Sequence, residues 1–161
     1  TDAVNGKEKA SRGDFTASED DNVLVQGVSR DKNAIGYFGL AYYEENKDKL
    51  KAVKIINRGA TKAVAPSLET VMAGTYLPLA RPIFIYVSDK AMGRPEIKEF
   101  IAFYLKNSPK LVKEVGYVPL SAAHYEQALK NFNSGKLGTG FGGKNEVGIR
   151  VEELLKREAH L

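Results

Sequence analysis

The sequence predicts an α/β protein in which short helices alternate with short strands. Helix-start signals, an acidic or hydroxyl residue directly before an apolar run, recur along the chain, for example at Ser67 and Ser121. Short runs rich in β-branched or aromatic residues lie at 34–38, 50–57 and 83–87. We find no internal repeat and no long disordered tract.

The N-terminal part of the chain contains two helix signals. Residues 1–6 resemble the last turn of a helix closed by Asn-Gly, which predicts that this helix starts before residue 1. Ser18 begins a capping-box pattern, with Asp21 three residues later in place of the usual Glu or Gln. The helix that follows is expected to turn an apolar side inward, formed by Val23, Leu24, Val25 and Val28.

The next elements are short. We predict a strand at 34–38, a tyrosine-rich helix at 40–46 and a second strand at 50–57. Ser67 then caps a short helix, because its hydroxyl can accept a backbone N–H of the first turn. The inward side of that helix is expected to be formed by Leu68, Val71 and Met72.

The run Ile83–Val87 is the clearest strand signal. Its five residues are all apolar, which predicts a strand buried on both faces, since a strand with one solvated face alternates apolar and polar residues. Pro78 and Pro82 precede the run and favour extended backbone at its entry.

The last half of the chain is predicted to be mostly helical. Pro95 occupies a first helical position, and apolar residues follow it at helical spacing. Ser108 starts a separate short helix, and Ser121 caps a third. A final helix at 151–158 carries its acids early and its bases late, as the helix dipole favours.

Composition excludes several kinds of site. The 161 residues carry 24 basic and 20 acidic side chains with the signs interspersed, which indicates a solvated surface rather than a nucleic-acid footprint. No cysteine is present, so disulfides, thiolate zinc sites and a cysteine nucleophile are excluded. His124 and His160 lie too far apart in sequence to suggest a metal cluster. We expect neither a nucleic-acid partner nor a bound metal.

The glycine-rich stretch Gly138–Lys144 leaves an alternative function open. It matches both G-x-G-x-x-G and G-x-x-x-x-G-K, patterns of loops whose backbone N–H groups hold phosphates. Asn145 stands where such a loop needs Ser or Thr, and a helix rather than a strand is predicted before the stretch. A flexible surface connection is the other interpretation. The alternative function is a small nucleotide-binding enzyme that uses this loop.

Two polar clusters near the N-terminus have more than one interpretation. The acidic block Glu19–Asn22 offers the hard oxygen ligands that Ca²⁺ or Mg²⁺ prefers. Its spacing does not match an EF-hand loop, and helix capping explains most of its acids. Arg12 and Asp14 form an anion clamp, a loop ion pair or part of an Arg-Gly-Asp adhesion tripeptide. Neither cluster suggests a nucleophile–base pair.

Four blocks of the sequence together resemble the phosphate-binding protein of bacterial ABC phosphate importers. The blocks occur in the family's order over nearly the whole chain. They are Asp14–Val28, Ala34–Gly39, Tyr76–Tyr86 and Val115–Leu120. The resemblance implies a periplasmic-binding-protein-like fold of two α/β lobes joined by crossover strands, with one oxyanion held in the cleft between the lobes.

On this resemblance the chain contains an incomplete, C-terminal part of both lobes. Residues 1–80 would belong to the second lobe, 81–87 to a crossover strand and 88–161 to the C-terminal part of the first lobe. The implied function is not enzymatic. The chain would be the C-terminal portion of a high-affinity receptor that delivers inorganic phosphate to an ABC-type permease, in a periplasmic or extracytoplasmic location and without a cofactor.

The family's main phosphate-binding loops and its acidic acceptor, which selects protonated phosphate over sulfate, would precede residue 1. Arg12 and Asp14 imitate the family's Arg-x-Asp, but no Ser-Gly-Thr follows them. The ligand-binding residues that we predict in this chain are therefore Asp21 and Asn22, at a helix start near the cleft. The N-terminal half is expected as a second polypeptide, because strands such as 83–87 need neighbours to cover their apolar side chains.

Overall fold

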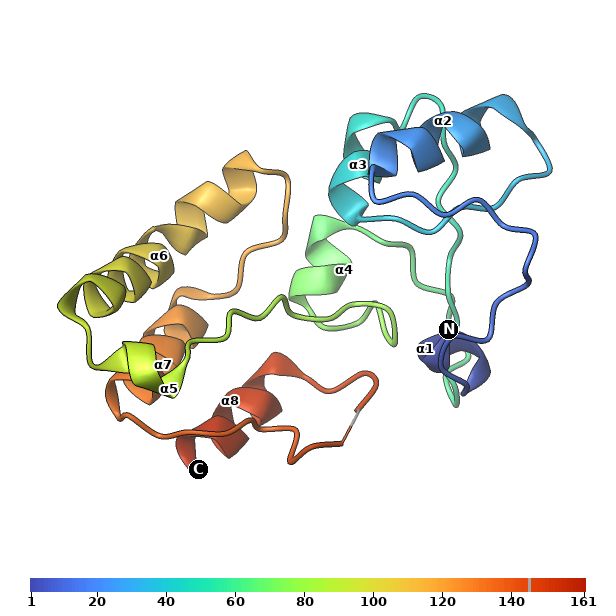
Figure 1. The fold of residues 1–161 in the computed structure, drawn as a ribbon. Helices are drawn as coiled ribbons and strands as arrows, with labels where there is room; N and C mark the ends of the chain where they lie inside the picture. The colour runs from blue at the N-terminus through green and yellow to red at the C-terminus, as the bar shows by residue number, and fades with distance from the viewer. Residues whose placement is uncertain (145) are drawn as a thin grey trace. The chain divides into compact units, whose positions relative to one another are not determined.

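The computed structural model describes residues 1–144 and 146–161, so the prediction made at Asn145 lies outside the described residues. Contacts divide the chain into two units, the first comprising 1–78 with 114–118 and the second comprising 79–113 with 119–161. Figure 1 labels the helices α1 to α8 of the described residues. Not one of these helices is long and apolar enough to cross a membrane.

The first unit contains the helices α1 (Asp2–Asn5), α2 (Asp21–Arg30), α3 (Leu40–Glu45) and α4 (Leu68–Met72). α2 and α3 pack against each other, and each supplies one buried apolar side chain, Val25 from α2 and Ala41 from α3. α1 ends at Gly6, whose φ of 70° lies in the left-handed region that favours glycine. The helix end predicted for residues 1–6 is confirmed.

Helix α2 starts two residues later than predicted. Its N-cap is Asp20 and not Ser18, because the Asp20 carboxylate accepts the backbone N–H of Asn22 at 2.9 Å. The Ser18 hydroxyl instead bonds locally to the backbone of Asp20, accepting its N–H and donating to its carbonyl. The predicted apolar inward side of this helix is wrong at Val23, because the Val23 side chain is exposed.

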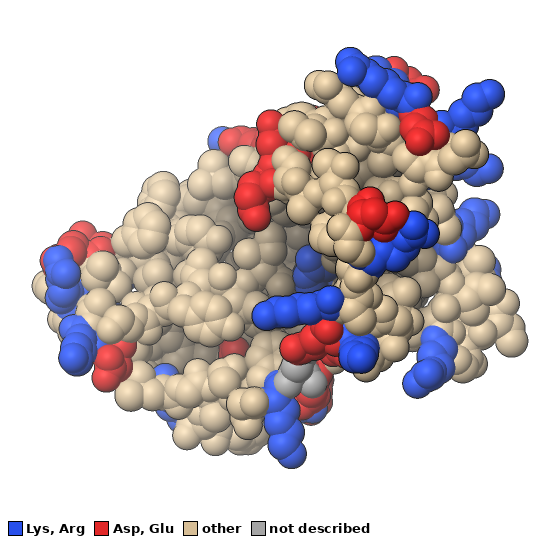
Figure 2. Space-filling model, turned by 45° about the vertical axis from the view of Figure 1, so that its right-hand side comes forward, with Lys and Arg blue, Asp and Glu red and all other residues tan. Residues whose placement is uncertain are grey.

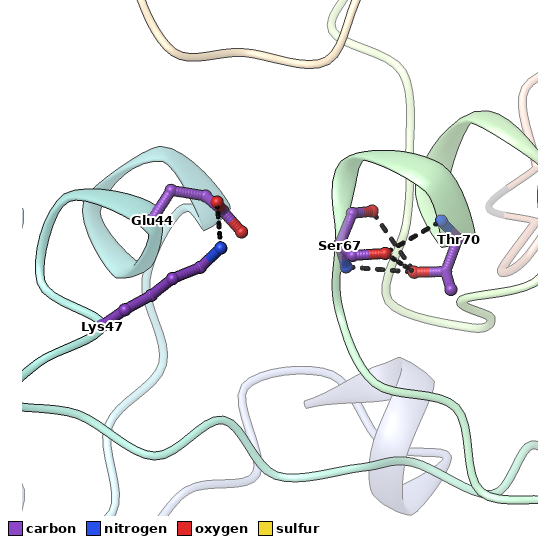
Figure 3. Close-up of polar contacts among 4 residues, drawn as sticks. All are labelled: Glu44, Lys47, Ser67 and Thr70. Carbon is purple, nitrogen blue, oxygen red and sulfur yellow. Dashed lines mark hydrogen bonds and ion pairs between the residues drawn. The ribbon is translucent and has the colours of Figure 1, made fainter.

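Helix α4 has the cap predicted from Ser67. Ser67 and Thr70 form a reciprocal capping box, in which the Ser67 hydroxyl accepts the Thr70 N–H at 3.1 Å and Thr70 Oγ1 accepts the Ser67 N–H at 3.0 Å (Figure 3). The predicted inward side is wrong at Leu68 and Met72, whose side chains are exposed. The cap is local, whereas burial needs a neighbouring surface.

The predicted strands of the first unit form no ladder within the described residues. Residues 34–38 make no bridge, and 50–57 contributes a single antiparallel bridge between Ile55 and Val64. The physical reason is that a strand needs the backbone of a neighbour to satisfy its N–H and C=O groups. Here the sequence pattern of a strand is present without the partner strand.

The second unit is built on α5 (Asp89–Met92), α6 (Pro95–Glu114), α7 (Ala122–Asn133) and α8 (Val151–Ala159). α7 and α8 pack together over Leu154 and Leu155, which are buried. The Asn131 side-chain amide of α7 donates to the Leu155 carbonyl of α8 at 3.2 Å. Ser121 caps α7 as predicted, accepting the His124 N–H at 3.3 Å.

The predicted break before α6 residue Pro109 is wrong, because one helix runs through it. A proline inside a helix removes a backbone donor and crowds the preceding turn. The two residues before it bond to carbonyls one turn earlier. Asn107 Nδ2 donates to Phe103 O at 2.7 Å, and the buried Ser108 hydroxyl donates to Tyr104 O at 2.7 Å. Neither bond reaches the Leu105 carbonyl, the acceptor that a backbone N–H at position 109 would use.

The run Ile83–Val87 is not the buried strand that its composition predicts. It leads into α5 as an uncoiled trace (Figure 1) and makes no ladder with any described residue. The side chains of Ile83, Ile85 and Tyr86 are exposed. The described residues therefore form a helix-rich structure, and the strand part of the α/β prediction is not seen in it.

Candidate ligand-binding site

The predicted ligand-binding residues Asp21 and Asn22 occupy the first turn of α2. Asp21 Oδ2 accepts a long hydrogen bond of 3.5 Å from the Gly39 N–H, at the N-cap of α3. Asn22 donates twice to Asp20 Oδ1, from its backbone N–H at 2.9 Å and from its side-chain amide at 3.0 Å. Asp21 therefore joins the starts of α2 and α3, while Asn22 is exposed at the helix end.

The acidic block before α2 provides the N-cap of that helix. One Asp20 oxygen is occupied by the two bonds from Asn22, as an N-cap requires. Within the described residues there is no group of three or more histidine or acidic side chains placed to hold a metal ion. The capping interpretation of the block is the one that the geometry supports.

The glycine-rich stretch packs against the second unit. Gly140 is buried, and a Cβ added to it would lie 2.8 Å from Leu154 Cδ1 of α8. The ring of the next residue, Phe141, meets the Phe84 ring edge-on at a centroid distance of 5.6 Å. Residues 140 and 141 thus form a packed connection between the 83–87 segment and α8, which does not support a phosphate-cradling loop.

Arg12 and Asp14 bind each other. The Arg12 guanidinium makes two bonds to the Asp14 carboxylate, at 2.8 Å and 2.5 Å. This pairing holds the pKa of Asp14 below its usual value. Both side chains are exposed, so the pair is a local ion pair of a loop. An adhesion tripeptide would need both charges turned toward a partner.

A groove of about 320 Å³ between α7 and α8, which was not predicted from the sequence, is lined by both histidines. His124 Nε2 lies 3.7 Å from Glu152 Oε1, and His160 follows the end of α8. The α8 residues that line the groove are Glu152, Leu155, Lys156 and Ala159. Their spacing of three and four places them on one helix face, and this signal was visible in the sequence.

A second hollow of about 330 Å³ lies in the same unit. It is lined by opposite charges from Asp89 of α5 and Lys98 of α6, with Phe132 of α7 as its largest apolar side chain. Neither of these two hollows is lined by the predicted site residues Asp21 and Asn22.

Glu158, in α8, is a half-buried acid of the second unit. Burial raises the pKa of this carboxyl above its usual value of 4.5, and a hydrogen bond with Asn131 opposes the rise. The raised pKa has a structural cause and is no sign of a catalytic group.

Charged side chains of both signs lie beside one another over the face shown in Figure 2. The ion pairs follow the same pattern, for example Arg94 with Glu96 at 2.5 Å and Arg157 with Glu146 at 2.7 Å. The interspersed charge expected from the sequence is seen on this face.

Comparison with known families decides what kind of protein this is. The profile described as "PBP superfamily domain" matches residues 2–108, which is more than half of the chain. The chain belongs to the PBP superfamily. Its fold is therefore a PBP superfamily fold, as the sequence resemblance implied.

Two curated relatives match almost all of the chain, and a third matches 70% of it. Protein SphX of Synechococcus elongatus is 57% identical over 150 residues, which is 93% of this chain and 44% of that protein. Protein SphX of Synechocystis sp. is 46% identical over 161 residues, which is 99% of this chain and 47% of that protein. The phosphate-binding protein PstS of Staphylococcus haemolyticus is 42% identical over 113 residues, or 70% of this chain and 35% of that protein.

A solved structure gives the same grouping. It is described as a possible phosphate binding protein from Planctomyces limnophilus, with a TM-score of 0.65 and 44% identity over 83% of this chain and 47% of the other. The resemblance stated from the four sequence blocks is confirmed. The chain spans less than half the length of the relatives that it matches. Nothing in these names supports the nucleotide-binding alternative.

Proposed function

We propose that the chain is the C-terminal portion of a receptor that binds inorganic phosphate and delivers it to an ABC-type permease. The observation that supports this proposal most is the 57% identity to SphX over 150 residues, together with 42% identity to a protein named for phosphate binding. The receptor would act in the periplasm or another extracytoplasmic space. It would need no cofactor and catalyse no reaction.

The two-lobe arrangement is part of this proposal. Residues 1–80 would contribute to the second lobe, 81–87 would form a crossover strand and 88–161 would complete the first lobe. The division of contacts between residues 78 and 79 supports a change of unit near this point. Membership of the PBP superfamily supports the fold class.

We propose Asn22 and Asp21 as the residues of this chain nearest the phosphate. Asn22 carries amide donors, and it lies at the positive end of the α2 dipole, where anions are favoured. Asp21 would act by keeping the starts of α2 and α3 together through the Gly39 N–H. The primary phosphate ligands would come from outside this chain.

A second polypeptide, equivalent to the N-terminal half of the relatives, is the partner that the proposal requires. More than half of each of these relatives lies outside the part that matches this chain. The exposed apolar side chains of both units support this partner, since they include Ile35 in the first unit and Ile83 in the second. The permease is the further partner of the assembled receptor.

Titration calorimetry tests the function. The chain would be mixed with the remaining part of Synechococcus elongatus SphX and titrated with phosphate, sulfate and ATP. Of the three ligands, we expect only phosphate to give a heat of binding. An acidic acceptor in the binding site would accept the proton that phosphate carries and sulfate lacks. Tight binding of ATP that is lost in Lys144→Ala would overturn the proposal in favour of the nucleotide-binding alternative.

The same titration tests the two site residues. Asn22→Ala removes a donor to a charged ligand and should weaken phosphate binding about tenfold or more. Asp21→Asn keeps an acceptor for the Gly39 N–H and removes a negative charge beside the anion, so the affinity should hold or rise. Asn33→Ala, on an exposed turn after α2, is the matched control. Equal affinities for Asn22→Ala and Asn33→Ala would place Asn22 outside the site.

A further inference from the structure

Asn5 and Gly6 form the one Asn-Gly pair of the sequence, and they lie where α1 ends. Both residues are exposed, and a Cβ added to Gly6 would meet no atom within 4 Å. Asparagine is a thermolabile residue, because its side-chain amide can be attacked by the backbone nitrogen that follows it. A glycine in the next position leaves that nitrogen unhindered. The pair therefore combines a reactive amide with free access for water.

The reaction that this pair can undergo is deamidation. The Gly6 backbone nitrogen gives up its proton to water or hydroxide, attacks Asn5 Cγ and forms a new N–C bond. The bond between Cγ and Nδ2 breaks, and Nδ2 leaves as ammonia with a proton taken from water, which produces a cyclic imide. Water then opens the imide at either of its carbonyls and leaves aspartate or isoaspartate at position 5. The net change consumes a water molecule and releases ammonia, without oxidation or reduction.

Two hydrogen bonds in the structure oppose this reaction. The Gly6 N–H donates to the Asp2 carbonyl at 2.8 Å, in the bond that closes the last turn of α1. The Asn5 side-chain amide donates from Nδ2 to the Ala10 carbonyl at 3.0 Å. The attacking nitrogen and the leaving nitrogen are both engaged, so the last turn of α1 has to open before the attack. Such opening is available because helix ends fray far more readily than helix interiors.

A third hydrogen bond favours the reaction once the turn is open. The Lys7 N–H donates to Asn5 Oδ1 at 3.1 Å. Attack on Cγ develops negative charge on Oδ1, and a donor already in place stabilises that charge. The step that the structure holds back is therefore the opening of the bond between Gly6 and Asp2.

We propose that Asn5 is a deamidation site whose rate is set by opening of the last turn of α1, and that the product releases the loop 6–11. The carboxylate formed at position 5 has no proton to donate to the Ala10 carbonyl, so the bond across this loop is lost. Ala10 is half-buried and lies two residues before Arg12. The proposal goes beyond the proposed function and does not depend on phosphate binding.

Peptide mass spectrometry tests the site. The chain is held at pH 8 for several weeks and digested, and the fraction of each asparagine converted to the acid is followed with time. We expect conversion at Asn5 to be at least ~10-fold faster than at Asn33, which is exposed on a turn but is followed by alanine. Asn5→Gln should show no conversion at this position, because its longer side chain would have to close a larger ring. Conversion at Asn5 no faster than at Asn33 would overturn the assignment.

Two glycine variants test the control by α1. Ala3→Gly lowers the helix propensity inside α1 and should raise the rate of conversion at Asn5 about fivefold. Ala17→Gly, on an exposed segment outside the helices, is the matched control and should leave that rate unchanged. Equal rates in the two variants would overturn the claim that opening of α1 limits the reaction.

Hydrogen exchange tests the consequence for the loop. Asn5→Asp carries the carboxylate of the product. We expect the Ser11 amide, which donates to the Lys9 carbonyl within the loop, to exchange about fivefold faster in Asn5→Asp than in the unmodified chain. The Val71 amide, bonded to Ser67 in α4, is the internal control and should exchange at the same rate in both. An unchanged rate at Ser11 would contradict the release of the loop.

Discussion

The close contact of Gly140 with α8 indicates that the glycine-rich stretch packs against this helix. A Cβ at this residue would lie 2.8 Å from Leu154 Cδ1, closer than non-bonded carbon atoms approach, and 3.1 Å from the Leu154 carbonyl oxygen, which is a tight contact. Glycine is favoured here because the loop and α8 come close together, and a side chain would force the Leu154 side chain or backbone to shift. The spacing of glycines alone could not distinguish close packing from phosphate binding.

Gly140→Ala is expected to lower the free energy of unfolding by about 1–3 kcal/mol, because the added methyl group overpacks against a backbone oxygen. Gly13→Ala is the matched control, since a Cβ there meets no atom within 4 Å. Urea denaturation of the two variants measures the difference. Equal loss in both would mean that the contact between the loop and α8 is absent in solution.

Glu158 gives a prediction about pH. The folded protein holds this proton more tightly than the unfolded chain, because burial raises the carboxyl pKa above its usual 4.5. The stability that this group contributes is therefore present below pH 4.5 and is lost as the pH rises through the raised pKa. Glu158→Gln should match the unmodified chain at low pH and exceed its free energy of unfolding at pH 7.

Denaturant titrations at pH 4 and pH 7 check this expectation, with Glu126→Gln on the exposed side of α7 as the control. The control should show the pH dependence of the unmodified chain. If Glu158→Gln shows it too, burial of Glu158 has no measurable effect on folding.

At the scale of the helix, the caps were predictable and the lengths were not. Ser67 and Ser121 cap α4 and α7 as the sequence indicates, because a cap depends on residues only three positions away. The start of α2 was misplaced since Ser18 and Asp20 are both capable caps, and only the geometry shows that Asp20 takes the role. The continuity of α6 through Pro109 was not predicted, because a proline usually interrupts a helix.

Asp20→Ala is expected to lower the free energy of unfolding by about 0.5–2 kcal/mol, because it leaves a first-turn N–H of α2 without its acceptor. Glu19→Ala, one residue earlier and exposed, should change it by less than about 0.5 kcal/mol. Thermal unfolding followed by circular dichroism compares the two. A larger effect at Glu19 would contradict the assigned cap.

At the scale of the whole chain, the accessible surface is 12074 Å², whereas a compact protein of 17.7 kDa has about 8,000 Å². The buried apolar residues of the described chain are few, namely Val25, Ala41, Ile101, Leu154 and Leu155. Since stability follows the apolar area removed from water, each unit has a small core for its size. The predicted strands carry strand-like sequences, but the described residues supply them with no neighbouring backbone beyond the single bridge between Ile55 and Val64.

The urea dependence of unfolding tests whether the buried cores of the two units are small. The m-value scales with the area exposed on unfolding, so the chain alone should have an m-value well below that of a compact domain of 161 residues. Adding the SphX remainder should raise both the m-value and the free energy of unfolding. An m-value for the chain alone that equals that of a compact domain would contradict the small cores.

The sequence by itself determined the helix starts at Ser67 and Ser121, the helix end at Gly6 and the family, because caps and family-typical blocks are local patterns. Tertiary structure alone decided which apolar residues are buried, how Gly140 is used and whether 83–87 is paired. Those outcomes depend on groups distant in the sequence. A strand-like pattern shows that a segment can adopt extended backbone, but a sheet forms only when a neighbouring backbone supplies the hydrogen-bond partners.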